Sequence, residues 1–243
     1  ISIIGTGQFG FSTILYFLWR NNKNNFLDCF DKDIKSSKKT SSFYKFKRSC
    51  DDFNNIFESD SCKLIYVASN HFTHTQYAIK ALENNIDVFV EKPLSVNFEQ
   101  FNLLQKKIKE TKAKIYSGYN RPHSKAISTI RENIQDEPFT INCFVSGHLI
   151  PKDHWYRNPQ EGTRICGNLG HWIDLSLHLL KCRTISFPEN YEVTIVQADT
   201  REPDDNLSVL PLANNFMSGS GVGLSNQATI NQLLSRTLLQ EKD

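Results

Sequence analysis

The chain has 243 residues, a formal net charge of +2, and 22% charged residues. It is long enough for one large domain or two modest ones. No stretch approaches the roughly 18 consecutive apolar residues that a membrane span needs, and the near-neutral charge gives no electrostatic reason to expect a nucleic-acid partner.

The cysteines are scattered and form no Cys-x-x-Cys pair. This pattern, without clustered histidines, argues against a zinc site, so we expect no metal and reduced thiols in a cytoplasmic protein. We expect no secretory signal, because the chain opens directly on an apolar, strand-like run. It begins with Ile1, so we expect the start to be trimmed or to belong to a longer polypeptide.

The apolar run Ile1–Ile4 is followed by the pattern G-x-G-x-x-G and then by apolar residues at helical spacing through about Asn21. In such a turn the first glycine allows a tight bend, the second lets the backbone approach a pyrophosphate, and the third lets helix and strand pack closely. The N–H groups of the helix N-terminus then face the phosphates. We therefore predict a dinucleotide site rather than an incidental turn, with contacts from Gly5, Gly7, Gln8, Phe9 and Gly10.

A second strand is predicted at Phe26–Phe30, and it leads into Asp31. A carboxylate at this position accepts hydrogen bonds from the adenine ribose and repels a 2′-phosphate. NAD is therefore the expected cofactor, although nearby lysines leave NADP as an alternative. Asp28 and Asp33 are alternatives to Asp31. The polar, Ser- and Lys-rich segment at 32–47 is expected to be a solvated surface loop.

Strands at Lys63–Ala68 and Ile86–Val90 flank a helix predicted at Thr75–Asn84. This alternation predicts a parallel sheet with right-handed crossovers.

Ser69, Asn70 and His74 follow the first of these two strands and are expected to contact the cofactor. His71 and His74 have a spacing that a metal site could use. No third ligand lies near them in the sequence, so we favour a helix cap or a contact at the cofactor edge.

Val88–Val90 runs directly into Glu91-Lys92-Pro93, where proline ends the strand because it cannot donate to a sheet ladder. Ligands of an open parallel sheet bind outside the carboxyl ends of its strands, so Lys92 would face the ligand. A surface lysine in a loop is the plainer alternative. A helix capped by Asn97 and a strand at Ile115–Tyr119 follow, and we expect the domain boundary near Tyr119.

The second part of the chain is predicted to contain a helix at Ser124–Asn133, a loop at Pro151–Pro159 rich in rings and charges, and a helix at Gly167–Leu180. His171, Asp174 and His178 share one face of the last helix. That face is either a solvated stripe or part of a site. Further strands are predicted at Phe139–Gly147, Glu192–Ala198, Leu207–Leu212 and Gly219–Ser225, with a final helix at residues 230–238.

Together these residues resemble the Gfo/Idh/MocA oxidoreductase family. The resemblance covers nearly all of the first domain and about half of the second, and its most specific element is Glu-Lys-Pro at a strand end. The segments that carry it are Gly5–Gly10, Ala68–His74, Ala81–Leu94 and Gly167–Asp174. Residues 119–121 and 153–156 further resemble a branch associated with bacterial surface-sugar metabolism.

The resemblance implies an α/β chain with an N-terminal Rossmann dinucleotide-binding domain at 1–119. A C-terminal α+β domain at 120–243, with an open, mostly antiparallel sheet, would bind substrate and pair subunits into a homo-oligomer. That second domain is short for the family.

The implied activity is hydride transfer between NAD(P) and a secondary alcohol of a sugar, nucleotide sugar or cyclitol. Lys92 would be the base and His171 its partner, while Glu91 and Lys92 would also contact the cofactor. The implied substrate-binding residues are Tyr119, Arg121, His154, Trp155, Asn168 and Asp174.

Two departures from the family leave alternatives open. Many members carry an aspartate where this chain has Gly167, and the similar branch tends to have a glutamate where Asn168 stands. A catalytically silent dinucleotide-binding sensor or partner subunit is therefore one alternative, and redox-assisted cleavage of a glycosidic bond is another.

Overall fold

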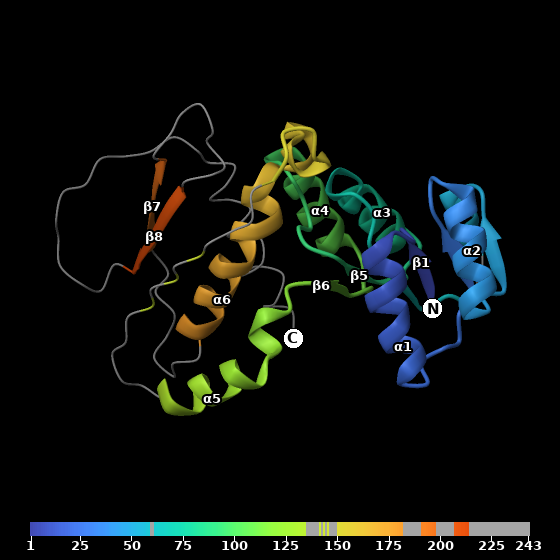
Figure 1. Cartoon of the computed structure of the whole chain (residues 1–243), viewed down its shortest axis with the longest axis horizontal. Coiled ribbons are helices and arrows are strands. Elements are labelled where there is room, and N and C mark those ends of the chain that lie inside the picture. Colours follow the sequence, from blue (N-terminus) through green and yellow to red (C-terminus); the bar gives the residue numbers. More distant parts are fainter. Residues whose placement is uncertain are drawn as a thin grey trace. The chain divides into compact units, whose positions relative to one another are not determined.

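The computed structural model describes residues 1–58, 61–134, 141, 143, 145, 150–181, 191–197 and 207–213 (Figure 1). The chain divides into two compact units, Ile1–Gly118 and Tyr119–Asp243. Within the described residues, no helix is long and apolar enough to cross a membrane.

The first unit is built on a six-stranded parallel sheet of order β3-β2-β1-β4-β5-β6. Ile3, Ile65 and Val88 are fully buried in its central strands, as expected for a parallel sheet that is covered on both faces. This order is the doubly wound dinucleotide-binding topology, so the predicted fold of this part is confirmed. The strands are β1 Ser2–Ile4, β2 Asp28–Phe30, β3 Arg48–Cys50, β4 Leu64–Val67, β5 Asp87–Val90 and β6 Ile115–Ser117.

Helices connect these strands. The first begins with a π-helical turn at Gly10–Leu15 and continues as α1 Tyr16–Arg20, and a 3-10 helix spans Phe53–Glu58. Helix α2 packs on β2 and β3, while α3 packs on β4, β5 and α4. The α-helices of the unit beyond α1 are α2 Ile34–Tyr44, α3 His71–Glu83 and α4 Phe98–Glu110.

The prediction of a surface loop at 32–47 was wrong. Residues 34–44 form α2, and β3 follows within a few residues. The buried stripe of α2 consists of Ser37, Thr40 and Tyr44, whose small or hydroxyl-bearing side chains carry no apolar periodicity. The Ser37 hydroxyl lies 2.9 Å from the Ser49 hydroxyl of β3, so hydrogen bonding helps to fix the helix to the sheet.

In the second unit, α5 Lys125–Ile134 packs with α6 Gly170–Leu180 around Ile127, Leu175 and Leu179. Short 3-10 turns span Arg121–His123, Trp155–Arg157 and Pro159–Glu161, and a π-helical turn at Ile165–Leu169 leads into α6.

Strands β7 Tyr191–Gln197 and β8 Leu207–Ala213 pair antiparallel (Figure 1). They match two predicted strands of the second unit. Most of the strand predicted at 139–147 lies outside the described residues, as do the predicted strand at 219–225 and the final helix at 230–238.

Candidate active site

The carboxyl ends of the central strands form one edge of the sheet. Ile4 pairs with Phe30 and with Val67, Val67 pairs with Val90, and Val90 pairs with Ser117. The ladder extends one residue further, because the backbone N–H of Gly5 donates to Phe30, that of Ala68 to Ile4, that of Glu91 to Val67 and that of Gly118 to Val90. Segments distant in sequence therefore reach this edge side by side.

The glycine turn at this edge is held by two close backbone approaches. Gly5 has a φ of +94°, and a Cβ there would lie 2.5 Å from the carbonyl carbon of Ala68. A Cβ on Gly10 would overlap the carbonyl oxygen of Gly5. A Cβ on Gly7, in contrast, would meet no protein atom within 4 Å. Protein packing thus explains why positions 5 and 10 are glycine, while the space above Gly7 is open.

Asp31 is tied to the glycine turn. Its Oδ2 accepts hydrogen bonds from the Thr6 backbone N–H at 2.7 Å and from the Thr6 hydroxyl at 3.1 Å. Asp28 is buried and pairs with Arg48 at 2.8 Å, and Asp33 caps α2 by accepting from Lys35 N. Of these three aspartates, Asp31 is therefore the carboxylate beside the turn. Gln8 and Phe9, also expected at the cofactor, are exposed in the first helical turn.

His74 joins two loops of the same edge. Its ring is buried, with Nδ1 2.8 Å from the carbonyl oxygen of Pro93 and Nε2 3.0 Å from that of Ser69. The neighbouring Thr75 hydroxyl donates to the carbonyl of Leu94 at 2.8 Å. Asn70, the residue before α3, is half-buried, as is Ser69. The loop after β5 is thus bound along the first turn of α3.

Glu91 and Lys92 are half-buried at the end of β5, and the Lys92–Pro93 peptide is cis. The Glu91 side chain packs on Gly118, where a Cβ would lie 2.7 Å from Glu91 Oε1. Burial raises the pKa of the Glu91 carboxyl to about 7, even though Lys92 acts in the opposite direction. A carboxyl that titrates near neutrality therefore precedes the candidate base directly.

In the second unit, His171 lies at the start of α6 beside Tyr119. The two rings meet edge to face with centroids 5.5 Å apart. Arg121 places its guanidinium 4.6 Å from the centroid of the Trp172 ring, which is a cation–π contact. Tyr119, Arg121 and His171, predicted from separate segments, are therefore gathered around the first turn of α6.

The polar stripe of α6 is not a solvated face. His171 and Asp174 are both buried. His178 is half-buried, and burial is the main cause that lowers the pKa of its ring, with Arg131 and His123 adding to the effect. Of the two readings that the sequence left open, solvation of the stripe is excluded.

The loop before α6 carries three clustered rings. His154 and Trp155 have ring centroids 5.9 Å apart, and those of Trp155 and Tyr156 are 4.6 Å apart. Arg157 Nε donates to the carbonyl of Ile150 at 2.9 Å and fixes the end of the turn. His154 and Trp155 are exposed, as is Asn168 in the π-helical turn.

Three residues that contact the candidate site residues were not predicted from the sequence. Thr6 holds Asp31, Gly118 accommodates Glu91, and Tyr156 packs on Gly167. Gly118 and Gly167 were visible as glycines next to expected site residues. Their packing partners lie far away in the sequence, or on the other side of a loop, so no spacing pattern reveals them.

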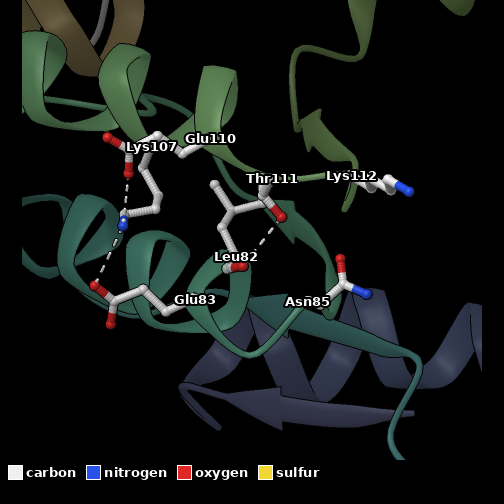
Figure 2. A pocket seen from close by; sticks show the side chains of 7 residues that line it. All are labelled: Leu82, Glu83, Asn85, Lys107, Glu110, Thr111 and Lys112. Atoms are coloured by element: carbon white, nitrogen blue, oxygen red, sulfur yellow. Dashed lines mark hydrogen bonds and ion pairs between the residues drawn. The ribbon is translucent and has the colours of Figure 1, made fainter.

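A surface hollow lies elsewhere in the first unit, lined by the ends of α3 and α4 (Figure 2). Because both helices run back from the carboxyl edge, this hollow lies at the amino edge of the sheet. Lys107 of α4 pairs across it with Glu83 of α3 at 3.7 Å, and with Glu110 of its own helix at 3.0 Å. Its residues are Leu82, Glu83, Asn85, Lys107, Glu110, Thr111 and Lys112. These balanced charges have no connection with the glycine turn or Lys92.

Thiol and metal chemistry find little support in the described part of the chain. Burial raises the pKa of Cys29 to about 12 and that of Cys50 to about 11, so neither thiol is a nucleophilic thiolate at neutral pH. No group of three or more His, Cys, Asp or Glu side chains in this part is arranged to hold a metal ion.

Residues 1–119 match the family model described as Oxidoreductase family, NAD-binding Rossmann fold, which is the Gfo/Idh/MocA model. This part of the chain belongs to the Gfo/Idh/MocA oxidoreductase family. The match covers the sheet, the glycine turn and the Glu-Lys-Pro segment, so the resemblance in sequence and the topology agree.

Curated relatives of the chain include two proteins of Bacillus subtilis (strain 168). Glucose-6-phosphate 3-dehydrogenase is 22% identical over 153 residues, which are 60% of this chain and 43% of that protein. The scyllo-inositol 2-dehydrogenase (NAD(+)) is 29% identical over 127 residues, which are 51% of this chain and 34% of that protein. The chain thus spans less than half the length of these relatives.

Solved structures share the fold of this chain at low sequence identity. Levoglucosan dehydrogenase in complex with NADH and levoglucosan has a TM-score of 0.63 and 15% identity, with 82% of this chain and 56% of that chain covered. GenD2 from gentamicin A biosynthesis, in complex with NAD, has a TM-score of 0.66 and 16% identity, with 86% and 61% covered.

Proposed function

We propose that this chain is an NAD(P)-dependent oxidoreductase that transfers hydride between nicotinamide and a secondary alcohol of a sugar or cyclitol. One observation carries the proposal: the glycine turn, Asp31 and Glu91-Lys92 lie along the same carboxyl edge of the sheet. Curated relatives in the family are named as dehydrogenases of glucose 6-phosphate and scyllo-inositol, which favours a polyhydroxylated substrate.

The residues of the edge fit a dinucleotide. The open space above Gly7 allows a pyrophosphate to approach the backbone, and the N–H groups of the following turn favour its negative charge. Asp31 keeps acceptor capacity for the ribose hydroxyls, because each carboxylate oxygen can accept more than one hydrogen bond. Its charge favours NAD over NADP. Gln8, Phe9, Ser69 and Asn70 complete the proposed contacts, with His74 acting through the backbone that it holds.

A nicotinamide bound at this edge would supply the acceptor for the hydride of the alcohol carbon. The hydroxyl must lose its proton in the same reaction, so a base is required within about 3 Å of it. We assign this role to Lys92, whose neutral amine can accept the proton. His171 orients the hydroxyl.

The proposed substrate contacts come from the second unit. Tyr119, Arg121 and Asp174 lie around the first turns of α6, where they can bind hydroxyl groups. The exposed rings of His154 and Trp155 can stack on the apolar face of a sugar, and Asn168 offers an amide. Assembly into a homo-oligomer through the second unit remains a prediction.

The test is NADH formation by the full chain with glucose 6-phosphate, scyllo-inositol or levoglucosan, in NAD⁺ and separately in NADP⁺. We expect oxidation of at least one of these alcohols and a preference for NAD⁺. If NADH quenches the tryptophan fluorescence but no alcohol changes the NADH absorbance, the sensor role replaces the enzymatic one. Net cleavage of a glycoside without net NADH would identify the redox-assisted lyase or hydrolase.

A further inference from the structure

The start of α6 is covered by two tyrosines that pack on two glycines. A Cβ on Gly170 would lie 2.8 Å from the hydroxyl oxygen of Tyr119. A Cβ on Gly167 would overlap Cζ and the hydroxyl oxygen of Tyr156 and lie 2.7 Å from its Cε1. Each glycine therefore makes room for a phenol, and both phenol hydroxyls lie against the helix.

His171 stands four residues after Gly167. The π-helical turn that contains Gly167 leads directly into α6, so positions 167 and 171 are neighbours on one face of the helix. The Tyr119 ring contacts the His171 ring edge to face. A side chain on Gly167 would begin where the Tyr156 hydroxyl stands, so this phenol occupies the position of a residue-167 side chain.

The position of Tyr156 is fixed from both sides. Its backbone N–H donates to His154 Nδ1 at 3.2 Å, and its ring contacts the Trp155 ring. The bond from Arg157 to Ile150 then holds the end of the turn. A half-buried ring bound in this way loses little conformational freedom when it binds a ligand.

We propose that Tyr156 is a further catalytic residue, whose hydroxyl donates a hydrogen bond to the reacting oxygen of the alcohol beside His171. This inference rests on the proposed function and gives a role to a residue that has none in it. In the oxidation, the C–H bond breaks with its electron pair passing to nicotinamide, the O–H proton passes to the base of the proposed function, and a C=O bond forms. The phenol neither gains nor loses a proton.

A hydroxyl suits this position chemically. Negative charge grows on the alcohol oxygen as the proton leaves, and a donor placed there stabilises the transition state more than the ground state. A carboxylate at position 167 could accept a proton but, when ionised, could not donate. Tyr156 thus supplies a hydrogen-bond donor at Gly167, a position that has no side chain of its own.

The experiment compares Tyr156→Phe, which removes one oxygen atom, with Tyr116→Phe, which alters an exposed tyrosine of β6. Steady-state oxidation of the best alcohol from the panel is measured with NAD⁺, together with NADH binding. We expect Tyr156→Phe to lower kcat about 100-fold with a smaller change in KM, since the hydrogen bond strengthens in the transition state. The affinity of Tyr156→Phe for NADH should equal that of the wild-type chain. Tyr116→Phe should match the wild-type chain in kcat, in KM and in NADH affinity.

Two further measurements separate this role from simple packing. Gly167→Ala displaces the ring while keeping the hydroxyl, and we expect it also to lower kcat. In protein labelled with ¹³C at tyrosine Cζ, the signal that Tyr156→Phe removes should shift when the alcohol is added.

Wild-type kcat in Tyr156→Phe, or a ¹³Cζ signal that does not respond to the alcohol, would overturn this inference and leave the dehydrogenase activity standing. Absence of any turnover in the wild-type chain would refute the proposed function and this inference with it.

Discussion

Gly5, Gly7 and Gly10 occupy the three glycine positions of the motif, and the structure gives them different physical roles. Added methyl groups at Gly5 and Gly10 collide with backbone atoms, whereas one at Gly7 meets open space. Protein packing therefore does not require glycine at position 7, and we propose that a bound dinucleotide does. The three residues separate the folding role of the turn from its binding role.

We predict that one substitution in this turn lowers stability and that another weakens NADH binding. Gly10→Ala should lower the free energy of unfolding by about 1–3 kcal/mol, because its Cβ overlaps the Gly5 carbonyl. Gly7→Ala should leave the unfolding transition unchanged but weaken NADH binding at least about tenfold. Thermal unfolding and fluorescence titration with NADH measure the two effects. Equal affinity of Gly7→Ala and the wild-type chain for NADH would argue against pyrophosphate binding at this turn.

Glu91 should make stability depend on pH. Its pKa rises from 4.5 to about 7 on folding, so the folded state binds more protons than the unfolded state between these values. The contribution is fully present below pH 4.5 and is lost as the pH rises through about 7. Glu91→Gln should therefore stabilise the cofactor-free chain at pH 8, by roughly 1–3 kcal/mol, and have little effect at pH 4.5.

Urea unfolding at both pH values measures this effect. Glu99→Gln is the control, because Glu99 is an exposed carboxylate of α4. A stabilisation by Glu91→Gln of the same size at both pH values would show that Glu91 does not titrate in this window.

At the scale of the elements, the loop after β5 is held by side chains of the helices around it. His74 contacts the carbonyl of Pro93, and Thr75 donates to that of Leu94. Gln100 Oε1 accepts from Val96 N at 3.0 Å, and its Nε2 donates to the carbonyl of Phe72 at 2.8 Å. We infer that this network, which connects α3, α4 and the loop, determines where Lys92 stands.

We predict that His74→Phe loosens this loop although it keeps a ring of similar size. Buried carbonyls of Ser69 and Pro93 lose their contacts, which should cost about 1–3 kcal/mol of stability. Hydrogen exchange of the amides at 91–96 should become faster, and kcat should fall. His123→Phe, at an exposed position of the second unit, is the control. Unchanged exchange at 91–96 would show that His74 does not hold the loop.

The elements that could be predicted from the sequence are those whose buried side chains are apolar. Strands β1, β4 and β5 are recognisable from their aliphatic residues, and α4 from the cap in which Asn97 accepts from Gln100 N. Helix α2 could not be recognised, because it buries Ser37 and Thr40 instead of aliphatic residues. The stripe of α6 was ambiguous for a related reason, since burial of His171 depends on packing that the spacing of polar residues does not encode.

At the scale of the whole molecule, strand order follows from the alternation of strands and helices, and the motif order then places the glycine turn and Lys92 at one edge. The choice among Asp28, Asp31 and Asp33 could not be made from spacing, because all three stand within a few residues of the same strand end. Arg48 pairs with Asp28, and a cap engages Asp33, through contacts formed only in the fold. Tyr156 was overlooked for the same reason.

The proposed function requires one group to take the proton of the alcohol, and Lys92→Met tests this directly. Met keeps the length of the side chain and removes the amine. Lys112→Met, in the hollow at the opposite edge of the sheet (Figure 2), is the matched control. All proteins should still bind NADH, and kcat is measured with the cofactor bound. We predict that kcat for alcohol oxidation falls about 100-fold or more in Lys92→Met alone. Wild-type turnover by Lys92→Met with bound cofactor would contradict the account.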